Sequence, residues 1–158
     1  GILAHLEFYS PADLARVVLR TARILGIAIT PDGAEEIGRR SRGTPRIANR
    51  LLRRVRDFAM MGGHDIITAE QAAEALRCMD VDEIGLDRMD RRLLEVMITH
   101  YDGGPVGLQT LAVACSEEVR TIEEIYEPYL IQCGLLKRTP RGRMVTAKAY
   151  RHLNLLLR

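Results

Sequence analysis

Residues Gly43 to Arg56 read G-T-P-R-I-A-N-R-L-L-R-R-V-R, and they carry the strongest helix signal in the first half of the chain. Thr44 is a favoured helix N-cap and Pro45 suits the first helical position, so a helix is predicted to begin here. The apolar residues recur at helical spacing on one side, and the arginines take the other side. The sequence therefore predicts a helix with one buried face and one cationic face.

Arg46 falls in the first turn of that helix. A cation there meets unpaired backbone N–H groups and the positive end of the helix dipole, which is unfavourable unless an anion is also near. A phosphate would satisfy both the guanidinium and the helix end. The surroundings are cationic too, because arginines occupy positions 39, 40, 42, 46, 50, 53, 54 and 56 with no acid among them. Either this surface is solvated and paired with acids elsewhere, or it faces an anionic partner.

The first half of the chain carries the signals of four helices. Three begin at a hydroxyl residue followed by proline, at Ser10-Pro11, Thr30-Pro31 and Thr44-Pro45. They are predicted to end at Gly26, at Arg42 before Gly43, and at Gly62-Gly63. Thr68 and Gln71 form a capping box for a fourth helix that reaches about Met79. Residues 10 to 80 are therefore expected to form a small four-helix unit.

The second half has the pattern of a winged helix-turn-helix. Val81 to Asp87 lacks periodicity and marks a boundary. Three helices are predicted next, from Asp87 or Asp90 to Tyr101, from Leu108 to Cys115, and from a capping box at Thr121 and Glu124 to Gln132. Two strands, Leu135 to Thr139 and Arg143 to Thr146, flank a tight turn, and a last helix runs from Thr146 towards Leu155. This order predicts a mainly α fold with a small β-hairpin wing.

The charges of this second unit point to the wing as its contact surface. Lys137, Arg138, Arg141 and Arg143 lie within seven residues that contain no acid. The helix that would normally enter the major groove, Thr121 to Cys133, carries three glutamates (123, 124 and 127) and no base. Arginines beside an acidic helix suggest backbone contacts with little sequence preference. A solvated hairpin turn and a protein-binding winged helix remain alternatives.

Composition excludes several function classes. The net charge of +2 is too small to indicate nucleic-acid binding by itself, and three separated cysteines with four scattered histidines indicate neither a zinc site nor a disulfide framework. A reduced, cytoplasmic compartment is expected, and no apolar run approaches the roughly 20 residues of a membrane span. Phosphate-loop, G-x-S-x-G and H-E-x-x-H motifs do not occur, so no catalytic residue is predicted.

The start of the chain suggests a piece of a longer protein. The sequence begins at Gly1 without methionine and runs directly into Ile2 to Tyr9, a short strand-like segment. No second strand is predicted for more than a hundred residues, so its pairing partners are expected to lie elsewhere.

Four blocks of this sequence resemble the RuvB family, the bacterial AAA+ motors that drive branch migration of Holliday junctions. They are G-T-P-R-I-A-N-R-L-L-R-R-V-R-D-F-A from Gly43, M-D-R-R-L-L from Met89, G-G-P-V-G-L from Gly103 and E-P-Y-L-I-Q-C-G-L-L-K-R-T-P-R-G-R from Glu127. The resemblance extends over essentially the whole chain. It implies residues 1–9 as the last strand of an absent ATPase core, 10–81 as the AAA+ helical lid, and 82–158 as the winged-helix domain.

The resemblance also implies roles for individual residues. Arg46 matches the lid arginine called sensor 2, which reaches the nucleotide phosphates, and Tyr9 matches a position lining the nucleotide site. Arg138 and Arg143 match wing arginines that contact DNA, with Arg141 and Lys137 as neighbours. The turn Glu117-Glu118-Val119-Arg120 departs from the family pattern, which has its arginine one place earlier.

The implied function is the C-terminal part of an ATP-driven motor in DNA recombination, repair and the SOS response. The full-length parent would be an ATP-dependent four-way junction helicase that uses ATP and Mg, forms a homohexamer around double-stranded DNA, and works with RuvA and RuvC. Residues 1–158 alone are expected to be inactive, because the phosphate loop would lie upstream. The rival interpretation is a DNA-binding module of an initiator-like protein without motor function, which also joins a lid to a winged helix.

Overall fold

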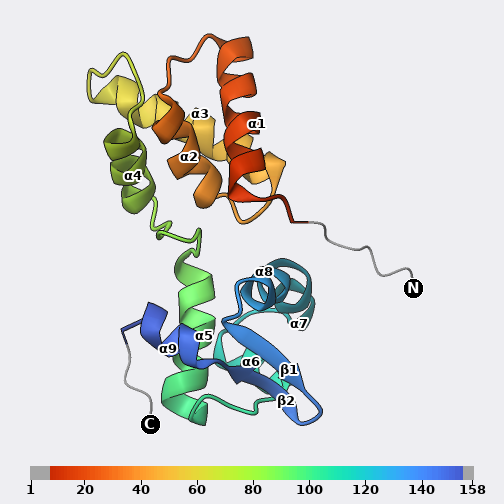
Figure 1. Cartoon of the computed structure of the whole chain (residues 1–158). Helices are drawn as coiled ribbons and strands as arrows, with labels where there is room; N and C mark the ends of the chain where they lie inside the picture. Colours follow the sequence, from red (N-terminus) through yellow and green to blue (C-terminus); the bar gives the residue numbers. More distant parts are fainter. Residues whose placement is uncertain (1–7, 155–158) are drawn as a thin grey trace. The chain divides into compact units, whose positions relative to one another are not determined.

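The computed structural model describes residues 8–154, and the chain divides into two compact units between Asp87 and Arg88 (Figure 1). All but two residues of the predicted strand Ile2 to Tyr9 lie outside the described residues. The predicted domain boundary, 81/82, stays a prediction. Among residues 8–154, none of the helices combines the length and the hydropathy that a membrane-spanning segment needs.

The first unit contains the four predicted helices, α1 Pro11–Leu25, α2 Pro31–Arg39, α3 Pro45–Met61 and α4 Ala69–Cys78. The N-cap hydroxyls Ser10, Thr30 and Thr44 each accept a hydrogen bond from a backbone N–H of the first turn. The capping box of Thr68 and Gln71 is also present. The local signals in the sequence therefore placed the beginnings of all four helices correctly.

Helix α3 is central to the core of this unit. Its apolar face, which includes Leu52 and Val55, packs with Leu14, Ile37 and Leu76 from the other three helices. The bundle is completed by the short parallel bridge between Ile29 and Ile67, which joins the loop after α1 to the loop after α3. The apolar and cationic faces predicted for α3 are therefore confirmed.

The predicted end of the second helix was wrong. Helix α2 ends at Arg39 rather than at Arg42. The Ser41 hydroxyl donates to the Ile37 carbonyl over 2.5 Å, and Arg42 and Gly43 both adopt positive φ angles, of 56° and 70°. A serine that bonds a backbone carbonyl, followed by two left-handed residues, forms a turn instead of another helical turn. At Gly43 a side chain is also excluded, because a Cβ atom would lie 2.6 Å from Cδ1 of Phe8.

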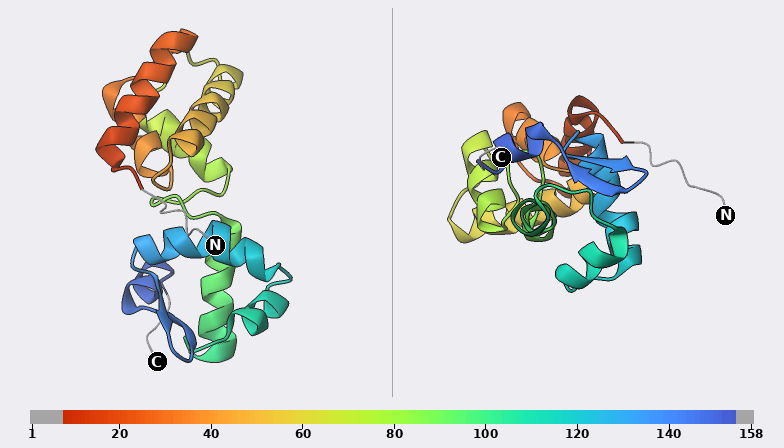
Figure 2. Two further views of the ribbon diagram at one scale, coloured as in Figure 1. Left: turned by 90° about the vertical axis from the view of Figure 1, so that its right-hand side faces the viewer. Right: turned by 90° about the horizontal axis from the view of Figure 1, so that it is seen from below.

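The second unit has the predicted order of helices followed by a hairpin. Its elements are α5 Arg88–Tyr101, α6 Leu108–Ala114, α7 Val119–Thr121, the π-helical segment Ile122–Tyr126, α8 Glu127–Gln132, β1 Leu136–Thr139, β2 Gly142–Val145 and α9 Ala147–His152. Strand β1 packs against α8 and β2 packs against α5, and the hairpin turn lies at the periphery of the unit (Figures 1 and 2).

The predicted capping box at Thr121 was wrong. The helix begins earlier, at Val119, and Thr121 has helical backbone angles with no side-chain cap hydrogen bond. The segment Ile122–Tyr126 then continues as a π-helix, immediately before Pro128 in α8. Proline lacks the N–H of an α-helical ladder, and a π turn is a common way to absorb such an irregularity. The second helix is therefore continuous but widened.

The wing is a two-stranded antiparallel hairpin in which Arg138 is paired directly with Arg143. A third segment supports it, because Val106 and Arg143 exchange two backbone hydrogen bonds of 2.8 and 2.9 Å. Gly142 lies at positive φ against this segment, and a Cβ atom there would be 2.5 Å from the Val106 carbonyl oxygen. The backbone at Arg143 is therefore fixed on both sides.

Cys115 should be protected from alkylation in the folded protein, and Cys78 should not. Cys115 is buried, and this burial raises the pKa of its thiol, whereas Cys78 is exposed. Because the thiolate is the reactive form, iodoacetamide at mildly alkaline pH should label Cys78 at least about tenfold faster than Cys115. Mass spectrometry of the labelled peptides measures both rates in one sample, with the urea-unfolded chain as control. Equal rates in the native protein would contradict the burial of Cys115.

Candidate functional site

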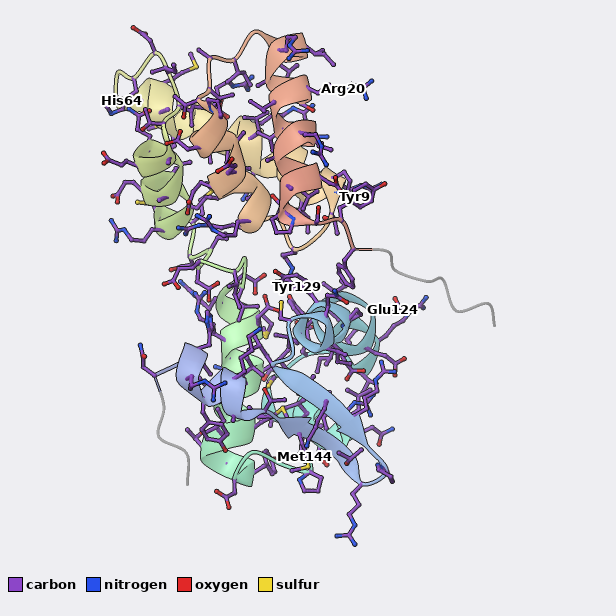
Figure 3. All side chains as sticks on the ribbon, in the orientation of Figure 1. Tyr9, Arg20, His64, Glu124, Tyr129 and Met144 are labelled. Atoms are coloured by element: carbon purple, nitrogen blue, oxygen red, sulfur yellow. The ribbon has the colours of Figure 1, made fainter. Side chains whose placement is uncertain are left out.

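The structure brings the two predicted nucleotide-facing residues to one corner of the first unit. The backbone N–H of Tyr9 donates to the Gly43 carbonyl over 2.8 Å, so the residue before α1 lies beside the loop that leads into α3. Arg46 follows in the first turn of α3 and is exposed. The Tyr9 side chain is 49% exposed and points away from the bundle (Figure 3).

The arginines around α3 fall into two classes. Four are tied to protein groups: Arg39 and Arg40 to Glu36, Arg42 to the Gly85 carbonyl, and Arg56 to Asp57. The other four are exposed and have no side-chain partner among the described residues, namely Arg46, Arg50, Arg53 and Arg54. Of the eight arginines that the sequence places in this region, only about half therefore form a cationic surface that is open to a partner.

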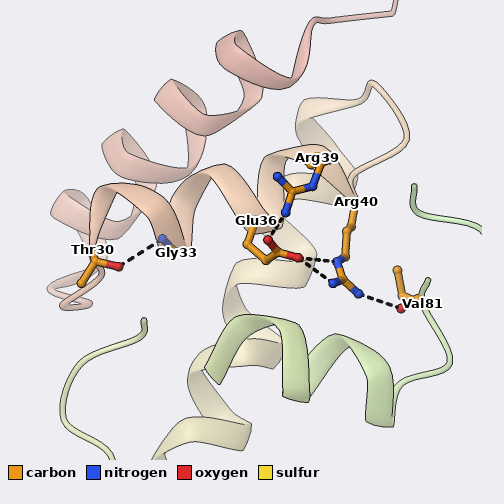
Figure 4. Close-up of polar contacts among 6 residues, drawn as sticks. All are labelled: Thr30, Gly33, Glu36, Arg39, Arg40 and Val81. Atoms are coloured by element: carbon orange, nitrogen blue, oxygen red, sulfur yellow. Dashed lines mark hydrogen bonds and ion pairs between the residues drawn. The ribbon is translucent and has the colours of Figure 1, made fainter. Parts of the chain in front are cut away.

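Glu36 is the acid that the sequence pattern did not reveal. Its carboxylate lies between Arg39 and Arg40 and is mostly buried (Figure 4). Arg40 donates to Glu36 Oε1 from Nε over 2.9 Å and from Nη2 over 2.5 Å. The remaining guanidinium nitrogen of Arg40, Nη1, donates to the Val81 carbonyl over 3.3 Å. This ion pair therefore joins α2 to the segment that follows α4.

The boundary segment Val81 to Asp87 is a folded turn held on the first unit. Asp82 Oδ1 accepts from the backbone N–H groups of Ile84 and Leu86, and Leu86 is fully buried. Arg42 Nη1 donates to the Gly85 carbonyl over 3.1 Å. Arg40 and Arg42 therefore attach this segment to the same corner that presents Arg46.

The predicted wing residues differ in their accessibility. Lys137 and Arg141 are exposed, and neither side chain has a partner within residues 8–154. The Arg138 side chain is 56% exposed, whereas that of Arg143 is only 18% exposed. The four cations therefore lie on one hairpin, but Arg143 is largely enclosed.

The prediction that three acids of the second helix face a partner was wrong for Glu127. Its side chain is completely buried and accepts hydrogen bonds from both Arg138 and Arg143. Glu123 and Glu124 are exposed: Glu123 Oε2 lies 3.9 Å from Arg143 Nη2, and Glu124 (Figure 3) pairs with Arg120. The hydrogen bonds that Arg143 donates to Glu127 raise the pKa of its guanidinium. The sequence signal is Pro128, which interrupts the hydrogen-bond ladder of this helix, but the burial of Glu127 beside it was not predicted.

The corner formed by Tyr9 and Arg46 carries groups that suit a nucleotide. An unpaired arginine at the N-terminus of a long helix suits phosphate oxygens, and a half-exposed tyrosine beside it suits a base or ribose. No group of three acids, histidines or cysteines among residues 8–154 could hold a metal ion. The described corner therefore holds side chains suited to phosphate oxygens and to a base or ribose.

Comparison with known proteins places both units in one family. Residues 9–82 match the family model of the RuvB AAA lid domain, and residues 83–154 match that of the RuvB C-terminal winged helix domain. The Holliday junction branch migration complex subunit RuvB of Nitratidesulfovibrio vulgaris is 73% identical over 99% of this chain and 49% of its own length. The corresponding protein of Acidothermus cellulolyticus is 59% identical over 98% of this chain and 42% of its own length.

Solved structures agree with this assignment. The Thermotoga maritima RuvB Holliday junction branch migration motor superposes with a TM-score of 0.94 at 44% identity, over 97% of this chain and 51% of that one. The present chain spans about half the length of the curated relatives and of the solved structure that it matches. The chain belongs to the RuvB family, of which it carries the AAA+ lid and the C-terminal winged helix.

Proposed function

We propose that this chain is the nucleotide-sensing and DNA-gripping part of an ATP-driven motor that migrates Holliday junctions in recombination and repair. The names of its relatives support the motor, since they are branch migration subunits and a branch migration motor. The wing supports the grip, because Lys137, Arg138 and Arg141 are exposed on one hairpin. Residues 1–9, 10–81 and 82–158 correspond in this proposal to a strand of the ATPase core, the lid and the winged helix.

The lid responds to nucleotide through Arg46 and Tyr9. Arg46 binds phosphate oxygens from the first turn of α3, where the helix dipole also favours an anion. Tyr9 covers the nucleotide from the beginning of α1. ATP with Mg, bound by a full-length protein, supplies the free energy of the cycle, and Arg46 makes the position of the lid depend on the phosphates.

The lid transmits its movement through Val81 to Asp87. Arg40 and Arg42 hold this segment on the corner that presents Arg46, so a change in lid position carries the segment with it. A flexible linker in place of this segment would not pass the movement of the lid on to the winged helix, since a flexible chain transmits little force over short distances.

The wing holds duplex DNA by its sugar-phosphate backbone. Guanidinium and ammonium groups on a hairpin reach phosphates of any sequence, and the outer acids Glu123 and Glu124 disfavour insertion of the second helix into the groove. Sequence-neutral contact is what translocation along a junction arm requires. The partners in this proposal are double-stranded and four-way junction DNA, a homohexameric ring in the cytoplasm, and RuvA and RuvC in the complete assembly.

Binding of the chain to a duplex and to a four-way junction, measured across a salt series, tests the wing contact. In Arg138→Ala/Arg143→Ala, affinity should fall at least about tenfold, and the slope of log K against log salt should decrease by about 1, because Arg138 is the exposed member of the pair and loses its phosphate contact. Fluorescence anisotropy with labelled DNA measures both quantities. Scrambling the DNA sequence should change neither.

Two further variants separate loss of contact from loss of structure. Lys137→Ala/Arg141→Ala removes two wing charges that have no partner within residues 8–154, so binding should weaken without loss of stability. Arg151→Ala removes one exposed charge from α9 and should leave binding nearly unchanged. If wild type binds DNA and none of the wing variants weakens that binding, the wing is not the DNA contact.

A further inference from the structure

Glu127 is an unusual acid because it is fully buried and bound to two arginines of the wing. Its Oε1 accepts from Arg138 Nε over 2.6 Å and from Arg143 Nη2 over 3.1 Å, and its Oε2 accepts from Arg143 Nε over 2.7 Å. Arg143 therefore binds both carboxylate oxygens, which is the strong bidentate geometry. Both carboxylate oxygens accept hydrogen bonds from arginine, so the buried negative charge is compensated by ion pairs within the fold.

The two arginines face each other across the hairpin. Arg138 and Arg143 form one of the directly opposite pairs of the antiparallel ladder. Like charges at such a position destabilise a sheet and push the side chains apart. The carboxylate of Glu127 binds both guanidinium groups and offsets this repulsion from inside the fold, while the exposed Glu123 lies 3.9 Å from Arg143 alone. Without it, the repulsion would favour conformations in which the two guanidinium groups point away from each other.

The two arginines are not equivalent within this cluster. The Arg143 side chain is 18% exposed, and its backbone is also fixed by Val106. The Arg138 side chain is 56% exposed although it too is bound to Glu127. Arg143 and Glu127 therefore form an enclosed base, and Arg138 is the member that can still meet a partner outside.

The π-helical segment explains how an acid of the second helix reaches the wing. Glu123 and Glu127 would share the outer face of an ordinary α-helix, since they are four residues apart. In the π segment Ile122–Tyr126 the backbone bonds run from i to i+5, and this wider turn rotates Glu127 around the helix axis, away from the direction that it would have in an α-helix. Ile122 and Glu127 are both buried, whereas Glu123 is exposed. The widened turn thus directs Glu127 inward towards the hairpin.

We propose that Glu127 is a positioning residue for DNA binding: its buried carboxylate holds Arg138 and Arg143 so that the exposed side of Arg138 is already oriented towards a phosphate. This inference rests on the proposed wing contact and specifies how that contact is built. An arginine already held in its binding conformation loses less side-chain entropy when it meets a phosphate. The acid therefore increases the affinity for an anionic partner, although its own charge repels that partner.

Removal of the Glu127 charge is therefore expected to change the DNA affinity in the direction opposite to that of other acids near a DNA surface. Removing an acid near a DNA surface normally strengthens binding, because it removes repulsion from the phosphates. Glu127→Gln, which keeps the shape of the side chain and removes its charge, should instead weaken duplex binding about tenfold, as for the loss of one charged hydrogen bond. Glu124→Gln is the matched control on the same helix, and it should leave the affinity unchanged or slightly higher.

A double-mutant cycle and a charge-conserving variant complete the test. In the Arg138→Ala background, Glu127→Gln should have little further effect on affinity, because the side chain that it positions is gone. Arg143→Lys keeps the charge but cannot bind both carboxylate oxygens, so it should also weaken binding and remains informative if Glu127→Gln fails to fold. Tyrosine fluorescence, which reports mainly on the second unit, checks folding of each variant.

The outcomes distinguish this inference from the proposed function. If Arg138→Ala weakens duplex binding while Glu127→Gln and Arg143→Lys, both folded, bind as tightly as wild type or more tightly, Glu127 is not a positioning residue and the wing contact stands. If Arg138→Ala has no effect on binding by a folded chain that otherwise binds DNA, the proposed contact of Arg138 is itself wrong. If Glu127→Gln weakens duplex binding in the wild-type background but not in the Arg138→Ala background, the result supports both the wing contact and the positioning role of Glu127.

Discussion

Gly142→Ala should destabilise the winged-helix unit by about 2–5 kcal/mol, the sum of a strained backbone and an overpacked contact. Gly142 has a φ of 136°, and a Cβ atom there would lie 2.5 Å from the Val106 carbonyl oxygen and 2.7 Å from its carbon. Both neighbours are backbone atoms that also hold Arg143, so neither can move without breaking the bridge to Val106. Urea unfolding followed by tyrosine fluorescence measures the effect, because four of the five tyrosines (101, 126, 129 and 150) belong to this unit.

Gly134→Ala is the matched control for this substitution. Gly134 lies in the same unit and also has a positive φ, of 74°, but the nearest atom to its Cβ position is Lys148 Cδ at 3.9 Å. It should therefore cost only about 1 kcal/mol, the penalty for a left-handed conformation without a clash. The difference between the two variants isolates the contact with Val106. Equal losses would mean that the hairpin can move away from Val106 freely.

The fold was predictable where the deciding signals are local. Ser10, Thr30 and Thr44 cap helices as expected, because each needs only a hydroxyl and a following proline or helix-forming stretch. The hairpin was predicted to within one residue at each strand end, since Pro140 and Gly142 mark its turn. Two local predictions failed. The Ser41 hydroxyl bonds the Ile37 carbonyl and α2 ends early, and the helix predicted to start at Thr121 starts at Val119 and continues through the π turn before Pro128.

The candidate site was predictable only in part, for a related reason. Basic residues of the wing can be counted in the sequence, but Glu127 lies eleven positions before Arg138 and reaches it only through tertiary structure. The same holds for Glu36, which pairs with Arg40 inside the first unit. A charge count along the chain treats every arginine as free. Burial of a single acid changes which of them can meet a partner.

Arg40→Ala should destabilise the first unit by about 3 kcal/mol, because it leaves a buried acid without its main partner. The side chains of Arg40 and Glu36 are only 10% and 11% exposed. Removing the guanidinium also removes the donor to the Val81 carbonyl, so amide hydrogen exchange in Val81 to Asp87 should accelerate. Unfolding is measured by far-ultraviolet circular dichroism, with tyrosine fluorescence as evidence that the second unit is unaffected.

Arg39→Ala is the matched control, since Arg39 binds the same carboxylate from the surface. Its side chain is 51% exposed, so its loss should cost less than about 1 kcal/mol, as for other exposed ion pairs. It makes no bond to Val81, and exchange in the 81–87 segment should therefore stay as in wild type. Similar effects of the two variants would show that Glu36 needs only one arginine, and that Arg40 does not attach the segment to the lid. The contrast between them thus tests whether the corner behind Arg46 and the connection to the winged helix behave as one folded body.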